Sequence, residues 1–186
     1  MYDLRPFIAE IKKIVDRHYL GEPGKYKQWL TQNEKNSRNL GSTPYGCANA
    51  VNILYTINEL PKDIKEKEAF VKVLQDFQKK ENGLFDNPGN FATHTTAFVS
   101  GALNLLDAEP LYKAVDFERY STKEGLCDFM ESINWAKEPW LGAHLVQEYM
   151  RQCCLRTRQG MNGRITILTG WMLMQTLRQV FGKQML

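Results

Sequence analysis

Apolar residues recur every three or four positions along most of the chain, which is the spacing of one face of an α-helix. This spacing predicts a helix over residues 4–18, ending before a Gly/Pro-rich turn. Residues 63–80 and 122–135 repeat the pattern with charged groups opposite the apolar ones, so outer amphipathic helices are expected there. A further short helix is expected at 26–30. Because no segment alternates with the period of two that strands require, the predicted fold class is all-α.

Two other segments are apolar on nearly all sides, which predicts helices that lie inside the protein. The first runs from Tyr45 to about Asn58, after a Ser-Thr-Pro sequence that supplies a helix cap and a first-turn proline. The second begins near His94, after a turn-rich stretch. A loop is expected at 139–144, followed by a third inner helix near His144.

The expected inner helices begin 49 and 50 residues apart, at Tyr45, His94 and His144. Each interval contains one amphipathic helix, one Gly/Pro/Asn-rich loop and one apolar helix. A helical hairpin of this kind cannot bury its inner face alone, whereas several copies closed into a ring can. The pattern therefore predicts an incomplete α/α toroid of helical hairpins over residues 1–144.

A resemblance to a known superfamily rests on two short motifs. The sequence contains Gln78-Lys79-Lys80-Glu81-Asn82-Gly83-Leu84-Phe85, followed by His94-Thr95-Thr96-Ala97 and an Ala/Leu-rich helix. It resembles the repeat of the α/α-toroid proteins, the terpenoid cyclases, protein prenyltransferases and their relatives, in which a glutamine ending an outer helix is followed by Gly-x-aromatic. The resemblance covers 64–107 well and 1–144 loosely, and six-hairpin glycosidases and polysaccharide lyases share the hairpin architecture. It implies a toroid fold.

Neither activity of the cyclases or prenyltransferases carries over with this resemblance. The chain has no Asp-x-Asp-Asp acid motif, and no set of Asp, Cys and His maps onto the prenyltransferase zinc ligands. The four cysteines show no CxxC spacing, so neither a zinc site nor a disulfide framework is predicted, and no metal or cofactor is expected. Cys47 is expected to be a small buried thiol.

Composition describes a globular chain of 186 residues with 43% hydrophobic residues and a net charge of +3. No apolar run approaches the roughly 18 residues of a membrane-spanning helix, and the first residues do not resemble a secretory signal. A cytoplasmic location without a membrane partner is therefore expected.

The charge is unevenly distributed, because residues 145–186 carry a net +5 and the first 144 residues −2. This tail holds five of the seven methionines and no Asp. The tail can be translated in a shifted reading frame, in which the third base of each codon is joined to the first two bases of the next. With plausible synonymous codons this frame gives a hairpin-like sequence whose last motif, DPETGFW, parallels residues 79–85. We therefore predict that one base was lost after His144, that 145–186 are out-of-frame residues, and that the chain is the truncated front of a longer toroid protein. An altered frame explains the basic tail without a nucleic-acid partner, and none is expected.

Loops and helix starts at one end of such a ring are expected to line a ligand cavity, where exposed N–H groups favour polar or anionic groups. The ligand-binding candidates at these positions are Tyr45, Asn49, Thr95, Trp140 and His144. Tyr45 and Trp140 are either stacking platforms for a sugar or an isoprenoid, or simple core aromatics.

Two residues are candidates for catalysis. His94 is either a general base or ligand donor, because imidazole titrates near neutrality, or a group that hydrogen-bonds the start of its helix. Asp86 is either an acid–base carboxylate or a solvated loop residue. Glycosidic acid–base chemistry needs two carboxyl groups about 5 to 9 Å apart, and Glu81 is the other carboxylate of this loop.

Three classes of function remain open. A carbohydrate-active enzyme, a hydrolase or lyase acting on a saccharide, is favoured by hydrophilic loops and by the missing terpene motifs. A terpenoid-cyclase or prenyltransferase-like protein is favoured by the Gln-to-Phe repeat. The third class is a non-catalytic binding scaffold or a nonfunctional truncated product. The sequence leaves the reaction and the oligomeric state open.

Overall fold

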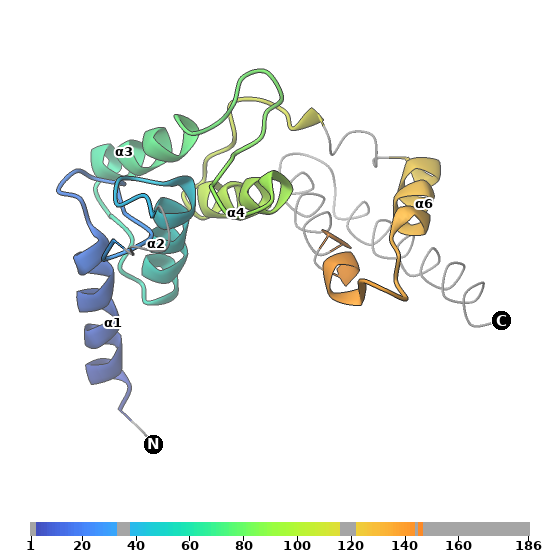
Figure 1. The fold of residues 1–186 in the computed structure, drawn as a ribbon. Helices are drawn as coiled ribbons and strands as arrows, with labels where there is room; N and C mark the ends of the chain where they lie inside the picture. Colours follow the sequence, from blue (N-terminus) through green and yellow to red (C-terminus); the bar gives the residue numbers. More distant parts are fainter. Residues whose placement is uncertain (1–2, 33–37, 116–121, 144, 147–186) are drawn as a thin grey trace. The chain divides into compact units, whose positions relative to one another are not determined.

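The computed structural model describes residues 3–32, 38–115, 122–143 and 145–146. These residues form helices α1 (Arg5–His18), α2 (Pro44–Thr56), α3 (Ile64–Gln75), α4 (Ala92–Leu105) and α6 (Lys123–Ser132), and they form no β-sheet (Figure 1). The predicted all-helical class is therefore confirmed. The chain divides into two compact units, Met1–Tyr112 and Lys113–Leu186, each of which is described by itself.

Three helices begin at a side-chain cap that the sequence signals. The Thr43 hydroxyl accepts a hydrogen bond from the Gly46 N–H at 3.0 Å. Pro44 occupies the first turn of α2, where its missing N–H breaks no helical bond. Asp63 and Thr122 cap α3 and α6 in the same way. These caps explain why the predicted starts of these three helices agree with the structure.

The predicted short helix at 26–30 is wrong. Tyr26 instead forms an isolated β-bridge with Tyr19, and Lys27 forms one with Ser42. Backbone groups that a helix would have paired locally are thus paired with distant parts of the loop.

The expected loop at 139–144 is also wrong, because residues 139–143 are helical. Pro139 occupies the first helical position, where its fixed φ favours the helix. The proposed third inner helix began at His144, which lies outside the described residues, as do 147–186, almost all of the tail assigned to an altered frame.

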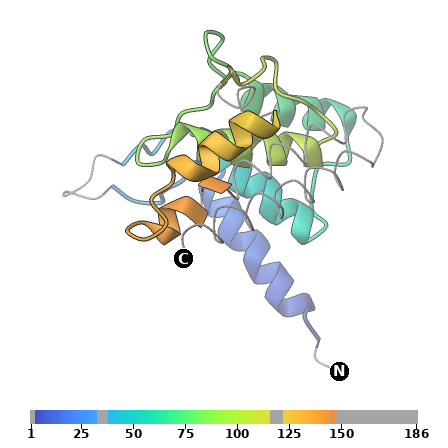
Figure 2. The same ribbon diagram turned by 90° about the vertical axis from the view of Figure 1, so that its right-hand side faces the viewer.

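Helices α2 and α4 pack against each other and supply the centre of the first unit. Val51 and Leu54 on α2, with Val99 and Leu103 on α4, are at most 3% exposed. Helix α3 covers this pair and lies beside both helices in Figures 1 and 2. The inner and outer positions expected for these three helices are therefore confirmed.

Helix α1 departs from the expected burial of its apolar face. Val15 is buried and Ile11 packs partly against the core, but Leu4 and Phe7 are 62% and 64% exposed. Both views show α1 running away from the other helices of its unit towards the N-terminus (Figures 1 and 2). Only the C-terminal part of this helix therefore reaches the core.

The loops that lead into α2 and α4 repeat one local geometry. Tyr19 and Tyr26 form an isolated bridge in the first loop, and Gln78 and Phe85 form the equivalent bridge in the second. In the first loop the Leu20 N–H donates to the Lys25 carbonyl at 3.1 Å. In the second loop the Lys79 N–H donates to the Leu84 carbonyl at 2.9 Å, at the equivalent positions. Each loop also has a glycine with positive φ two residues before its second bridge residue, Gly24 at 82° and Gly83 at 70°. Residues other than glycine rarely adopt this conformation.

Each loop is tied to the helix that follows it. The Tyr26 N–H donates to Cys47 Sγ on α2 at 3.4 Å, and the Phe85 N–H donates to Thr96 Oγ1 on α4 at 2.9 Å. The first pair is 21 residues apart and the second 11. The first loop therefore has ten more residues than the second between its bridge residue and the helix residue that it contacts.

The two inner helices also end alike. Asn58 follows α2 at φ 59° and Asp107 follows α4 at φ 56°. The N–H of the following residue then donates to a helix carbonyl five residues earlier, from Glu59 to Leu54 at 2.7 Å and from Ala108 to Leu103 at 3.0 Å. This is the 6→1 hydrogen bond of a Schellman cap. Because Asn58 and Asp107 are 49 residues apart, the repeat that the sequence spacing indicates is present in the local geometry of both helices.

Candidate functional site

The first turns of α2 and α4 bring two of the sequence-predicted residues together. Tyr45 is the second residue of α2 and His94 the third residue of α4. The Tyr45 hydroxyl and His94 Nε2 are hydrogen-bonded at 3.0 Å, with both side chains half-buried. Either atom can donate, because the imidazole tautomer decides the direction. Such a pair can pass a proton between a ligand and the imidazole.

Phe98 holds these two rings in place. The Tyr45 ring stacks on Phe98 with a centroid distance of 4.6 Å and an interplanar angle of 15°. The His94 ring lies 6.1 Å from Phe98 at 21°. Since Phe98 follows His94 by one helical turn, one helix face supplies both the imidazole and its packing partner. Tyr45 is accordingly part of an aromatic cluster and not an isolated stacking surface.

Asn49 and Thr95, the other ligand candidates of the inner helices, have different surroundings. Asn49 is half-buried and lies one turn after Tyr45, on the same face of α2. Thr95 is fully buried, and its hydroxyl donates to the Phe91 carbonyl at 3.2 Å. The Thr95 side chain therefore satisfies its own helix start, whereas Asn49 remains near the tyrosine–histidine pair.

Asp86 lies on the surface and forms an ion pair with Lys79. The two side chains are 47% and 44% exposed, and the hydrogen bond to the carboxylate raises the pKa of Lys79. Glu81 is exposed as well. The loop therefore holds solvated carboxylates, one of them already engaged by a lysine.

Trp140 and His144 belong to the second unit. Trp140 is 88% exposed, so it is not a core aromatic of the described part of that unit. His144 lies outside the described residues.

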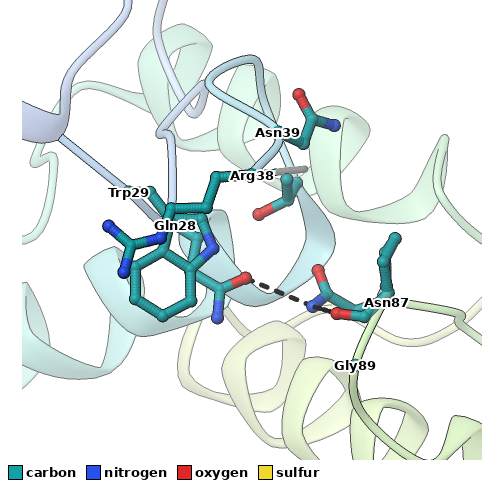
Figure 3. A pocket seen from close by; sticks show the side chains of 8 residues that line it. Gln28, Trp29, Arg38, Asn39, Asn87 and Gly89 are labelled. Carbon is teal, nitrogen blue, oxygen red and sulfur yellow. Dashed lines mark hydrogen bonds between the residues drawn. The ribbon is translucent and has the colours of Figure 1, made fainter. Parts of the chain in front are cut away.

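A pocket that the sequence did not predict lies beside the start of α2. It has a volume of about 290 Å³ and is formed by residues of the first loop and of the second loop (Figure 3). Its lining residues are Gln28, Trp29, Arg38, Asn39, Thr43, Asn87, Pro88 and Gly89. An aromatic ring, a guanidinium and three side-chain amides in one concave site are typical of polar ligand recognition.

Arg38 and Trp29 form one wall of this pocket. The Arg38 guanidinium carbon lies 4.4 Å from the centroid of the Trp29 ring, in a cation–π contact. Figure 3 shows the guanidinium beside the indole. In the part of the chain that the structure describes, no carboxylate forms an ion pair with Arg38. The pocket therefore offers a positioned positive charge.

Asn87 and Gln28 also line the pocket and are joined across it by a hydrogen bond. Asn87 is 3% exposed, and its Nδ2 donates to Gln28 Oε1 at 3.2 Å and to the Pro88 carbonyl at 3.3 Å (Figure 3). A carbonyl oxygen can only accept, so Nδ2 is the atom that faces Pro88. Asn87 Oδ1 is buried and has no hydrogen-bond partner among the described residues. A buried acceptor in this state costs about 1–3 kcal/mol.

Cys47 is the buried thiol that its sequence position indicates. It is 1% exposed and lies 3.2 Å from the Ser42 hydroxyl. Burial raises the pKa of this thiol, and its sulfur also contacts the Tyr26 backbone. The thiol form therefore predominates at neutral pH, which argues for a structural and not a nucleophilic role.

Within the described ranges, no cluster of three or more His, Cys, Asp or Glu side chains could hold a metal ion. None of the helices described here combines the length and apolar character needed to cross a bilayer.

No family model, curated protein or solved structure matches this chain. The candidate functional site therefore rests on the chemistry of its own residues.

Proposed function

We propose that the first unit is a carbohydrate-active domain in which Tyr45 and His94 transfer a proton at a bound saccharide. The supporting observation is the 3.0 Å hydrogen bond between the Tyr45 hydroxyl and His94 Nε2 at the starts of the two inner helices. A hydroxyl polarised by an imidazole serves as a general base in one direction and as a general acid in the other. The neighbouring pocket supplies polar groups that suit hydroxyl-rich ligands.

Elimination suits these residues better than hydrolysis. Glycoside hydrolysis uses two carboxyl groups that flank the bond, and Asp86 is engaged by Lys79 at the surface. Elimination requires only a base and an acid. The base removes a proton from a carbon next to a carbonyl or carboxyl group, a carbon–carbon double bond forms, and the neighbouring C–O bond breaks. The departing oxygen then takes up a proton from the acid.

An incomplete α/α toroid, of which this chain supplies the first hairpins, is part of this proposal. Support comes from the equivalent loops and helix ends of the two hairpins, at Tyr26 and Phe85 and at Asn58 and Asp107. Further hairpins would surround the ends of α2 and α4 and enlarge the cavity there. The terpenoid alternative receives less support, because amides and a guanidinium line the described pocket.

Binding without catalysis is the second candidate. It is favoured by the pocket itself, whose polar lining lies between loops and requires no proton transfer. On this alternative, Tyr45 and His94 only connect the two inner helices.

Activity on polysaccharides tests the proposal. The full chain is incubated with neutral and acidic polysaccharides, with new reducing ends and the ultraviolet absorbance of an unsaturated product as readouts. Tyr45→Phe keeps the ring but removes the hydroxyl, so we expect a loss of about 10²- to 10⁴-fold in rate. Tyr55→Phe is the matched control, because Tyr55 is 54% exposed on the same helix. Equal rates for both variants, or no product from the unmodified chain, would contradict the catalytic proposal.

A further inference from the structure

We infer that the pocket between the two loops binds a small carboxylate that also carries a hydroxyl group. This assignment concerns Arg38 and Asn87 and does not depend on proton transfer by Tyr45 and His94. Two observations carry it, both on residues that line the pocket: the Arg38 guanidinium held against Trp29 and the Asn87 amide oxygen that lacks a partner among the described residues. The ligand must therefore bring both an anionic acceptor and a hydrogen-bond donor.

Arg38 selects the anionic group. Arg38 is half-buried as a residue, and its guanidinium carbon lies 4.4 Å from the centroid of the Trp29 ring. The contact orients the planar donors, and a carboxylate accepts two of them at once in the geometry that arginine favours. Arg38 Nη1 also lies 3.5 Å from the Thr31 carbonyl, at the limit of a hydrogen bond. That weak bond leaves the guanidinium able to engage a stronger acceptor.

Asn87 selects the hydroxyl. Its Nδ2 is already bonded to Gln28 Oε1 and to the Pro88 carbonyl, so only Oδ1 lacks a partner within the described ranges. Buried polar atoms are nearly always satisfied, and an exception is a recognised place for a bound molecule. The terminal torsion of asparagine is broad, so the amide can turn slightly towards a donor in the pocket. A ligand hydroxyl then supplies the missing hydrogen bond.

The size of the pocket limits the ligand. About 290 Å³ accommodates about ten non-hydrogen atoms if each takes the roughly 30 Å³ of a liquid water molecule. Free hydroxy acids and the terminal sugar acid of a saccharide both provide the required groups at about this size. A longer saccharide would enter by one residue only.

Matched probes test both requirements on the full chain. Binding of malate, succinate, glucuronate and glucose is measured by ligand-detected NMR and by the shift in Tm. Malate differs from succinate by the hydroxyl, and glucuronate differs from glucose by the carboxylate. We expect malate to bind more tightly than succinate, or glucuronate more tightly than glucose. The first result identifies a free hydroxy acid as the source of the ligand, and the second identifies a sugar acid.

Substitutions assign any binding to this pocket. Arg38→Gln removes the charge from a half-buried side chain and is expected to weaken binding about tenfold or more without changing the Tm of the free protein. Arg17→Gln on α1 is the matched control and should bind normally. Asn87→Asp keeps Oδ1 but replaces Nδ2, the donor to Gln28 Oε1 and the Pro88 carbonyl, with a charged oxygen, so it should weaken binding and also lower the Tm of the free protein. Failure of all four probes to bind, or equal binding by wild type and Arg38→Gln, would overturn the inference.

The outcomes are distinguishable from those of the proposed function. Binding that depends on Arg38 without any polysaccharide product supports this pocket and contradicts catalysis by Tyr45 and His94. Product formation that survives Arg38→Gln, with no probe bound, supports catalysis and overturns the pocket assignment.

Discussion

The two loops of the first unit share one backbone geometry but are closed by different side chains. In the second loop, Gln78 Nε2 donates to the Gly83 carbonyl at 2.8 Å and to the Tyr112 carbonyl at 2.7 Å, and Gln78 Oε1 accepts from the Tyr112 N–H at 3.0 Å. Tyr19 holds the equivalent position in the first loop and is 40% exposed. One loop is thus locked by a buried amide, and the other is not.

The first loop supplies most of the residues that line the pocket. It is ten residues longer between the bridge and the helix contact and supplies Trp29 and Arg38, whereas the second loop supplies the short segment 87–89. The inferred binding site thus lies mainly on the longer loop, while the shorter loop is held by the Gln78 amide. Such a division is common where a repeated scaffold carries function on one of its loops.

The largest expected effect is at the bridge residue of the locked loop. Phe85 is fully buried, so Phe85→Ala should lower the free energy of unfolding by about 3–5 kcal/mol. Tyr26→Phe is the comparison at the equivalent bridge, because it keeps the ring contacts with Tyr19 and Phe70. We expect little change for Tyr26→Phe in urea unfolding. A similar loss in both variants would remove the distinction between the two loops.

The next effect concerns the glutamine lock. Gln78→Leu leaves the Gly83 carbonyl and both Tyr112 backbone groups without their partner, which should cost roughly 2–3 kcal/mol. Tyr19→Leu, at the equivalent position, should cost clearly less because Tyr19 is partly exposed. Chemical denaturation of both variants measures the difference. Equal costs would show that the amide does not lock the second loop.

A smaller effect is expected where each loop meets its helix. Thr96→Val removes the acceptor of the Phe85 N–H and should cost about 1–3 kcal/mol. Cys47→Ala removes a longer and weaker sulfur contact, so about 1 kcal/mol is expected, mainly from lost packing. Thermal unfolding of the two variants checks the order. If Cys47→Ala is the more damaging, the sulfur contact is the stronger tie.

Sequence spacing predicted helices α1, α2, α3, α4 and α6 and the 49-residue spacing of α2 and α4, but it misplaced a helix at 26–30 and missed the one at 139–143. Caps such as Thr43 and Asp63 lie next to the helices that they start, so local sequence was sufficient to find them. The glutamine motif was recognised as a pattern, but its partner Tyr112 is 34 residues away. Gln28 and Asn87 are 59 residues apart and meet only after both loops have folded. No periodicity encodes such a contact, which is why the pocket was missed while Tyr45 and His94 were found.

The smallest expected effect is at the turn after α4. Asp107 pairs with Lys67 on α3 at 2.6 Å, and this hydrogen bond lowers the pKa of Asp107. Asp107→Asn should preserve the turn, because asparagine also tolerates a positive φ, and remove only the charge. The pair should therefore produce a small Tm difference at neutral pH that salt screens.

The pH dependence of this difference follows from the direction of the pKa shift. A lowered carboxyl pKa adds stability above the unfolded value of 3.8 and loses it as the pH falls through the folded pKa. Wild type and Asp107→Asn should therefore converge in acid. Lys67→Met should match Asp107→Asn, and the double variant should lose no more than either single variant if the pair acts alone. A difference that persists in acid would mean that asparagine at position 107 changes the turn itself. The turns at Asn58 and Asp107 would then share a backbone shape, but asparagine and aspartate would not be interchangeable in them.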